Sequence, residues 1–463
     1  MVFNVTLFVI VLYLLAIILV GYFRGRGEHL LDFTVNRRRT STLLLTTAGL
    51  STAFGIGSIL GVSAEAYRTG ISYGLSTFFV VTLGFLLLIW LGPKIKRFGD
   101  SHNAQTIADF FAEKYSVSAS TITSVVTIFA FLLIASAQFI GIASLASVIT
   151  IVSWSVALVI AAIITIAYTS FGGLRNDIMT DFIQFWIILA MLVVMIPFSF
   201  IKQGGFDILR TLPVTSFNPF AYGGPVFFFG SMILGALVMI TQMDVWQRTY
   251  SAKSESTVRK AYVWSFIIAI PLYVLPVLFG LMARQLYPGI VGEQSLFTLM
   301  LSTLPSWLLG IGFAGILAAA MSSIDSMIIV GSTSFANDIY ARYIHKKEYE
   351  HHLLNKTRLF AVVFGTIALL IAYFVPNIVK LVVLGTFLTL NFLPAILGGF
   401  FWRKANAKAA FWSILVSTII LVASWIPLGT DAWLPAFFSS MIIYLVGGWI
   451  SYKPRIVLER QSQ

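Results

Sequence analysis

Long apolar stretches, separated by short polar loops, run along the whole chain. A membrane-spanning helix needs about 20 apolar residues, and thirteen stretches meet this criterion. They lie near residues 3–23, 43–65, 73–93, 119–151, 154–170, 178–200, 224–247, 261–287, 306–340, 358–376, 378–401, 409–428 and 432–452. The pattern therefore predicts an all-α integral membrane protein with thirteen transmembrane helices.

The composition supports a membrane protein and excludes a large soluble domain. Of the 463 residues, 58% are hydrophobic and 10% are charged, whereas soluble domains carry about 25% charged residues. The longest hydrophilic stretch, 342–356, is too short to fold alone. The first apolar segment follows no basic stretch and precedes no small-residue cleavage site, so we expect it to stay in the membrane.

Positive charge is concentrated in alternate loops. The net charge is +12, and charge alone would allow a nucleic-acid partner. However, most of the 30 Lys and Arg residues, Arg248 among them, lie on one side of the predicted membrane. The exceptions are Arg68, Lys202, Arg210, Arg284 and Lys380. Because positive loops stay in the cytoplasm, we expect a cell-membrane protein with its N-terminus outside, its C-terminus inside and no nucleic-acid partner.

The residue types do not indicate a catalytic site or a metal site built from cysteine or histidine. The chain contains no cysteine, which excludes disulfides, thiolate nucleophiles and cysteine-based metal sites. The histidines are spread over three charged loops, at His29, at His102, and at His345, His351 and His352. Since no nucleophile–base pair or cofactor motif is present, we expect neither an enzyme nor an organic cofactor.

The second apolar segment is unusually rich in small and hydroxyl residues. Backbone groups in lipid must be satisfied inside the helix, so irregular backbone survives only where it is buried in protein or lines a cavity. This segment could either unwind and direct carbonyls at a ligand, or pack closely against another helix through its small residues. The residues concerned are Thr46, Thr47, Gly49, Ser51, Thr52, Gly55, Gly57, Ser58 and Gly61.

The ninth segment carries hydroxyl groups on one helical face. Ala319, Ser322, Ser323 and Ser326 follow the i, i+3, i+4, i+7 spacing of one face. Neutral oxygens of this kind are ligands for hard cations. Asp325 lies beside them, and an ionisable residue within a membrane segment is a functional candidate. The alternative is that the serines bond back to the helix and that Asp325 is paired structurally.

A third group of polar residues lies at the inner mouth of the sixth segment. Asp181 and Gln184 share a helical face, although Asp181 could also be an ordinary N-cap. Glu65, Asp244 and Asp338 fall near predicted segment ends, where water is available. We therefore interpret these three as structural or gating residues.

Four motifs follow one another along the chain. The strongest is Ala-Ala-Met-Ser-Ser-Ile-Asp-Ser at 319–326, followed by Asn-Asp-Ile-Tyr at 337–340. The others are Gly172-Gly173 with Thr180, Asp181 and Gln184, and Trp246-Gln247-Arg248 with Ala252-Lys253-Ser254. In order and spacing, these motifs resemble the sodium:solute symporter family over essentially the whole chain.

This resemblance implies a LeuT-type fold with a 5+5 inverted repeat and broken helices at segments two and seven. Ligands then bind near the midplane, between unwound backbone and half-helix ends. The implied units are residues 1–42 (first helix and basic loop), 43–203 (first repeat, segments two to six), 204–401 (second repeat, segments seven to eleven) and 402–463 (two helices and a tail).

The resemblance also implies cation sites. A first Na⁺ would be held by the carbonyls of Thr47, Leu50 and Ala319 and the hydroxyls of Ser322 and Ser323. Asp181, Asp325 and Ser326, with Ser322 shared between the sites, would form a second site. Two carboxylates in one dry pocket do not both ionise easily. Either a second cation neutralises them, or one of them holds a proton.

For the solute, the residues around 51–54 and 63–66 look most similar to the choline-carrier branch, which surrounds a quaternary ammonium with aromatic rings. The corresponding positions here are Ser51, Phe54, Gln138 (or its neighbour Phe139) and Gln242. Because amides replace two of the rings, we expect a solute with hydrogen-bonding groups.

The leading hypothesis is a Na⁺-coupled secondary active symporter that imports a small polar or zwitterionic organic solute by alternating access. One alternative is a proton-coupled transporter that uses Asp181 and Asp325. Another is a membrane sensor that binds solute without moving it. The expected partners are the solute, Na⁺ and the lipid bilayer, and the sequence predicts neither the identity of the solute nor the oligomeric state.

Overall fold

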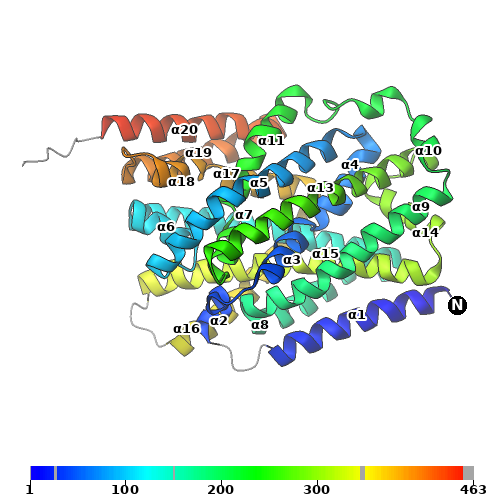
Figure 1. The fold of residues 1–463 in the computed structure, drawn as a ribbon, viewed down its shortest axis with the longest axis horizontal. Helices are drawn as coiled ribbons and strands as arrows, with labels where there is room; N and C mark the ends of the chain where they lie inside the picture. The colour runs from blue at the N-terminus through cyan, green and yellow to red at the C-terminus, as the bar shows by residue number, and fades with distance from the viewer. Residues whose placement is uncertain (1, 25–28, 150–151, 345–349, 452–463) are drawn as a thin grey trace, which may run out of the picture.

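The computed structural model describes residues 2–24, 29–149, 152–344 and 350–451, which form an elongated bundle of helices without a β-strand (Figure 1). The predicted loop residues Arg26, His345, Lys346, Lys347, Lys453, Arg455 and Arg460 lie outside the described residues. The helices are α1 (Val2–Arg24), α2 (Leu30–Val35), α3 (Thr42–Ala53), α4 (Val62–Thr69), α5 (Ser72–His102), α6 (Ile107–Lys114), α7 (Val117–Ile149), α8 (Trp154–Ala190), α9 (Ile196–Lys202), α10 (Phe206–Arg210), α11 (Gly224–Val238), α12 (Met243–Ser251), α13 (Glu255–Leu286), α14 (Ser295–Thr303), α15 (Ser306–Thr333), α16 (Glu350–Phe374), α17 (Ile378–Leu390), α18 (Leu393–Phe401), α19 (Ala407–Leu428) and α20 (Trp433–Ile450).

The helical class is as expected, but the count of thirteen membrane helices is not confirmed. Within the described residues, nine helices are long and apolar enough to cross a membrane, or ten if one bent pair counts as a single span. The apolar stretches Val5–Val20 and Trp154–Ser170 are shorter than a full span. The two predicted C-terminal segments fall inside one long helical stretch, Ala407–Ile450, which a short 3₁₀ turn divides into α19 and α20.

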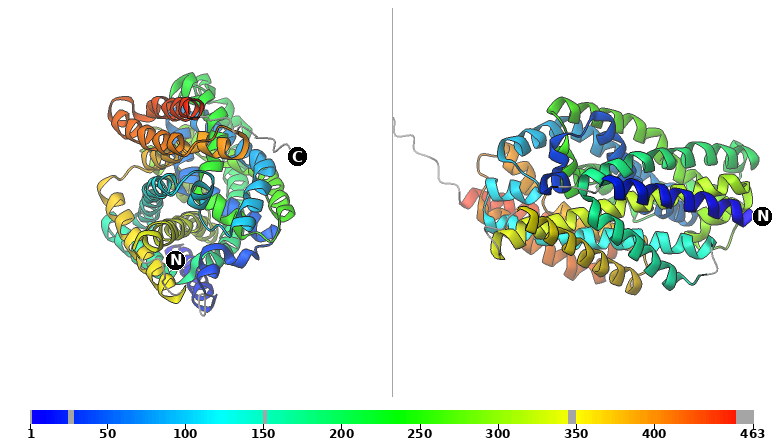
Figure 2. Two further views of the ribbon diagram at one scale, coloured as in Figure 1. Left: turned by 90° about the vertical axis from the view of Figure 1, so that its left-hand side faces the viewer. Right: turned by 90° about the horizontal axis from the view of Figure 1, so that it is seen from below.

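Helix α15 lies at the centre of the bundle, which Figure 2 shows along and across its long axis. The most apolar 18-residue stretch of this helix is completely buried, and α1, α7, α8 and α16 pack against it. Large apolar side chains are instead exposed on peripheral helices, for example Phe8, Ile163, Phe374 and Ile426. A bundle with buried hydroxyls inside and apolar side chains outside is suited to lipid.

Two helices are broken near their middle. The chain bends by 52° between α3 and the stretch Gly57–Thr69 that ends in α4, and Phe54 at the C-cap of α3 has non-helical ψ. In the second case, α11 passes through a 3₁₀ turn (Met239–Thr241) to Gln242, whose backbone is extended at the N-cap of α12. The predicted breaks in segments two and seven are both present, while the repeat boundaries remain a prediction.

Helix α8 contains a sharp kink at Gly173. Its φ of +52° is a left-handed conformation that favours glycine. A Cβ at this position would also lie 2.6 Å from the Cα of Phe33 on α2. The kink separates residues 154–172 from residues 174–190, and it lets the short helix α2 pack closely against α8.

Two loops are joined at the end of the bundle where the basic loops gather, which we call the basic end. Thr40, before α3, forms a parallel β-bridge with Ala252, which follows α12. The Thr40 amide donates to the Ser251 carbonyl at 2.9 Å, and the Lys253 amide donates to the Thr40 carbonyl at 3.0 Å. The Thr40 and Ser251 hydroxyls lie 2.8 Å apart. The ends of both broken helices are therefore tied together.

Candidate functional site

The break after α3 leaves carbonyl oxygens available to side chains. A helix ends with carbonyls that lack intrahelical donors, and here α15 supplies hydroxyls to them. Ser322 Oγ lies 3.1 Å from the Ser51 carbonyl, and Ser323 Oγ lies 3.1 Å from the Thr52 carbonyl. Each hydroxyl is also 3.1 Å from the Ala319 carbonyl. The hydroxyl face of α15 is thus in direct contact with the broken helix.

The other two predicted ligands of the first cation site, the carbonyls of Thr47 and Leu50, precede Ser51 on α3. The Leu50 carbonyl accepts a hydrogen bond from the Phe54 amide at 2.9 Å, within the helix. The Thr47 hydroxyl bonds back to the carbonyls of Leu43 and Leu44. Ala319, Ser322 and Ser323 therefore come together with α3 through Ser51 and Thr52, while no hydrogen bond in the described residues joins Thr47 or Leu50 to α15.

The irregular stretch between α3 and α4 is held in place by side chains. Gln138 on α7 accepts a hydrogen bond from the Ile56 amide at 2.9 Å, which satisfies a backbone group freed by the break. Gly55 lies so close to α15 that a Cβ there would overlap the Ser323 hydroxyl. Gln138, predicted as a solute ligand, supports the break in this state.

Of the remaining predicted solute residues, Phe54 lies at the break after α3 and Gln242 lies at the break before α12. The fully buried ring of Phe54 packs against the tilted ring of Tyr273 with 4.3 Å between ring centroids. The Tyr273 hydroxyl donates to the Ala53 carbonyl at 2.5 Å. Gln242, at the other break, donates to the Thr389 hydroxyl at 2.7 Å. Phe54 and Gln242 therefore line two different breaks, and the fourth residue, Ser51, belongs to the cation-facing turn of α3.

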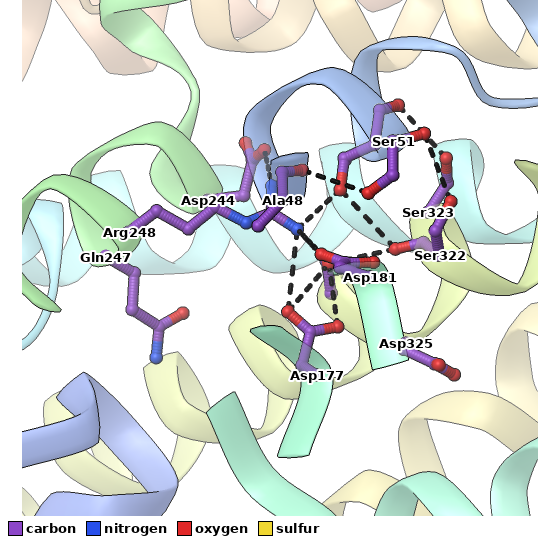
Figure 3. Close-up of polar contacts among 12 residues, drawn as sticks. Ala48, Ser51, Asp177, Asp181, Asp244, Gln247, Arg248, Ser322, Ser323 and Asp325 are labelled. Atoms are coloured by element: carbon purple, nitrogen blue, oxygen red, sulfur yellow. Dashed lines mark hydrogen bonds and ion pairs between the residues drawn. The ribbon is translucent and has the colours of Figure 1, made fainter. Parts of the chain in front are cut away.

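A buried arginine occupies the polar centre next to these oxygens. Arg248 on α12 is 3% exposed, and its guanidinium lies 3.1 Å from Asp181, 3.5 Å from Asp177 and 3.1 Å from Asp244. Figure 3 shows it reaching between the carboxylates of Asp177 and Asp181. We call Asp177, Asp181, Asp244 and Arg248 the aspartate–arginine cluster. With all carboxylates ionised, its formal charge would be −2.

The guanidinium also reaches the two helices of the oxygen site. Arg248 Nη2 donates to the Thr52 hydroxyl at 2.5 Å and to the Ser326 hydroxyl, and Ser326 lies 3.0 Å from Asp177. One side chain of α12 thus bridges α3, α8 and α15. A planar fork with several donors suits such a junction better than a lysine would.

This position corrects the interpretation of two residues. Arg248 was assigned to a basic loop at the membrane surface and Asp244 to a hydrated segment end, yet both are buried. The sequence places both residues in or next to a charged loop. In the structure they lie on α12, which continues from that loop into the protein interior. The i, i+4 spacing of Asp244 and Arg248, which matches an ion pair on one helical face, was the available sequence signal.

Asp325 lies apart from the arginine. Its carboxylate accepts hydrogen bonds from Tyr168 at 2.5 Å and Thr169 at 2.6 Å, both on α8. In Figure 3 no dashed line joins it to the cluster. Of the three residues predicted to form a second cation or proton site, Asp181 and Ser326 thus contact Arg248, whereas Asp325 is held by hydroxyl groups.

Two further acidic residues are also more buried than expected. Asp338 is 1% exposed and accepts from the hydroxyls of Thr106 and Ser124 at 2.9 Å. Glu65 is 7% exposed and pairs with Arg68 at 2.7 Å. Pairing with neighbouring side chains therefore accounts for both carboxylates, and their role as structural or gating residues stays a prediction.

A small cavity of about 140 Å³ lies between α5, α11 and α17. It is lined largely by apolar side chains, with hydroxyl groups from Tyr73, Ser76, Thr77, Ser231 and Thr386. Thr386 lies one helical turn before Thr389, the partner of Gln242. The cavity therefore adjoins the second break and combines apolar walls with a few hydrogen-bonding groups, which is typical of small-molecule sites.

The sequence pattern of the sodium:solute symporter family matches residues 33–417. The chain is 25% identical over 442 residues to a sodium/pantothenate symporter of Haemophilus influenzae, covering 92% of this chain and 91% of that one. It is 24% identical over 471 residues to the osmoregulated proline transporter OpuE of Bacillus subtilis, covering 96% and 94%.

The fold also matches a solved structure of a Na⁺-coupled sialic acid symporter in a substrate-bound, outward-open state. The TM-score is 0.83 at 19% identity, over 97% of this chain and 98% of that one. At this identity the similarity concerns the arrangement of helices only.

Proposed function

Because this chain belongs to the sodium:solute symporter family, we propose that it is a Na⁺-coupled secondary active symporter which imports a small polar organic solute by alternating access. Membership confirms the family resemblance of the sequence motifs and makes the protein a membrane transporter.

The observation that carries the proposal is the contact between the broken end of α3 and the hydroxyl face of α15. Ser322 and Ser323 bring two hydroxyls to within 3.1 Å of three carbonyl oxygens, those of Ser51, Thr52 and Ala319. Uncharged oxygens suit a hard monovalent cation. A small rotation of the two hydroxyls would turn their lone pairs inward, so that they would bind Na⁺ instead of donating to carbonyls.

We propose that one Na⁺ moves per cycle in this arrangement. A second cation would need Asp181 and Ser326, and both are already engaged by the guanidinium of Arg248. The arginine supplies the positive charge that buried carboxylates require. A second ion held by these two side chains could bind only if Arg248 moved away, although Asp181 retains one buried oxygen without a hydrogen-bond partner in the described structure.

For the solute, the cavity between α5, α11 and α17 supports a small molecule with an apolar body and a few polar groups. Its hydroxyls can donate and accept hydrogen bonds, whereas no ionised side chain lines it. This supports a neutral or zwitterionic compound over a strongly charged one. A zwitterion could place one charge toward the Gln242 amide and the unwound backbone, where partial charges are available.

The test is uptake into proteoliposomes. The solute is first found by a thermal-shift screen of small amino acids, betaines and hydroxy acids, each with NaCl and with KCl, because linked binding stabilises the protein most when both ligands are present. Uptake of that solute should require an inward Na⁺ gradient. Equal uptake after replacement of Na⁺ by K⁺ would reject Na⁺ coupling.

One observation favours a second candidate, coupling to protons. Asp325 is buried, and its described partners are the hydroxyls of Tyr168 and Thr169, not a basic group. A buried carboxyl without a counter-charge can hold a proton. Uptake driven by a pH gradient in the absence of Na⁺, and abolished by Asp325→Asn, would support this mechanism over the first.

A further inference from the structure

A polar cavity of about 330 Å³ lies at the basic end of the bundle, outside the cation and solute sites. It is framed by α2 with the loop that follows it, by the start of α3, and by α8 just after its kink. Three arginines line it, Arg37, Arg39 and Arg175, and Asp32 is the acidic residue in the wall. With the neighbouring His29 neutral, the lining carries an excess of two positive charges.

The acidic residue is already satisfied by two of the arginines. Asp32 is 5% exposed at its side chain, lies 2.8 Å from Arg37 and is 3.9 Å from Arg175. These two arginines keep 38% and 41% of their side chains exposed, and Arg39 is exposed as well. Donor groups that face the cavity therefore remain available to a ligand after the internal ion pairs are made.

The backbone places these arginines at a conformational cost. Asn36, Arg37 and Arg38 have φ of +45°, +45° and +56°, a left-handed conformation that is unfavourable for residues with a side chain. On the other wall, the positive φ of Gly173 brings α8 and Arg175 against α2. Strained backbone of this kind is found preferentially at ligand clamps and switch regions.

Apolar side chains are exposed on the two helices that frame the cavity on this side. Leu31 on α2 and Leu43 on α3 are 46% and 55% exposed, and Leu31 lines an adjoining cavity of about 540 Å³ that shares Arg37. An arginine cluster beside exposed leucines is suited to a phosphate group carried at the membrane surface.

We propose that this cavity binds a phosphate-type anion, through the guanidinium groups of Arg37, Arg39 and Arg175. The anion is either the headgroup of an anionic phospholipid or free phosphate, and both present the same tetrahedral oxygens to the arginine forks. Leu44 of α3 and Ile178 and Met179 of α8 complete the wall. A bound anion therefore braces the ends of the two helices that carry Ser51 and Asp181.

The experiment measures thermal unfolding of the full-length protein in a non-ionic detergent. The probes are dioctanoyl phosphatidylglycerol, dioctanoyl phosphatidylcholine and potassium phosphate, at an ionic strength held constant with KCl. We expect phosphatidylglycerol to raise the midpoint in a saturable way and phosphatidylcholine to leave it unchanged. A similar saturable shift with potassium phosphate would identify free phosphate as a ligand, and a shift with the lipid alone would identify the headgroup.

The variants Arg39→Gln and Arg39→Gln/Arg175→Gln test the residues. The single variant should need at least tenfold more phosphatidylglycerol or phosphate for the half-maximal shift, and the double variant should lose the shift. Arg97→Gln, which removes an exposed arginine elsewhere on the basic end, serves as the matched control and should keep it. No saturable shift with either anion, or a shift in Arg39→Gln equal to that of the unmodified protein, would overturn the proposal. If the double variant does not fold, the single variant alone decides.

Discussion

Replacing Arg248 by glutamine removes the one basic side chain from the aspartate–arginine cluster. The unmodified side chain is 3% exposed and lies within 3.5 Å of all three carboxylates. Removing one partner of a buried ion pair costs about 3–5 kcal/mol, because the remaining charge stays buried without compensation. A folded domain is stable by only about 5–15 kcal/mol, so we expect a large fall in the unfolding midpoint in KCl.

Na⁺ should reverse much of this loss in Arg248→Gln. With the guanidinium gone, Asp177, Asp181 and Ser326 offer oxygen ligands to a free cation. A ligand at 100 times its dissociation constant stabilises a protein by about 2.7 kcal/mol, which is comparable to the expected loss. The midpoint of the variant should therefore rise more steeply with NaCl than that of the unmodified protein.

The assay compares thermal unfolding in NaCl and KCl at equal ionic strength. Arg248→Lys keeps one positive charge but cannot contact all three carboxylates with a single ammonium group, so it should fall between the other two proteins. Arg97→Gln removes an exposed pair with Glu255 and should leave the midpoint nearly unchanged, since exposed ion pairs contribute little. If Arg248→Gln were equally unstable in NaCl and KCl, or as stable as the unmodified protein, the assignment of Arg248 as the counter-charge would be refuted.

Five other substitutions test the remaining parts of the site. Ser322→Ala and Ser323→Ala should each raise the Na⁺ concentration for half-maximal uptake at least tenfold while the protein still folds; unchanged Na⁺ dependence in both would remove that site. Gly55→Ala should destabilise the protein by about 1–3 kcal/mol through overpacking, because its Cβ would overlap the Ser323 hydroxyl. Gly57→Ala, whose Cβ would meet Val382 at an ordinary 3.4 Å, should cost much less in the same denaturation assay. Asp325→Asn should leave Na⁺-driven uptake active, and loss of all uptake at every pH would show that the carboxylate is needed in the Na⁺ mechanism.

The apolar pattern predicted the class of fold well, because lipid imposes a period and a length that few other constraints override. Each predicted segment overlaps one or more helices in the described residues. The break in the second segment was also visible, since small and hydroxyl residues accumulate around Gly55. The number of crossings was harder to predict, because hydropathy alone does not show whether the apolar parts of α8 before and after the kink at Gly173 each cross the membrane.

The site was predictable where one helix carried the whole signal. Ser322 and Ser323 share a face of α15, and their contact with α3 follows from the broken helix next to them. Arg248 could not be found in the same way. Its role depends on Asp177 and Asp181 from another helix, and the rule that assigns arginines to cytoplasmic loops gives no information about which of them turn inward.

The β-bridge between Thr40 and Ala252 has a mechanical consequence for the two broken helices. Because α3 begins just after Thr40 and α12 ends just before Ala252, the bridge couples the ends of the two helices. If α3 or α12 tilts at the basic end, the other helix must move with it, or the hydrogen bonds of the bridge must break first. We therefore expect α3 and α12 to move together when the protein opens at the basic end, without a stable state in which only one of them has moved.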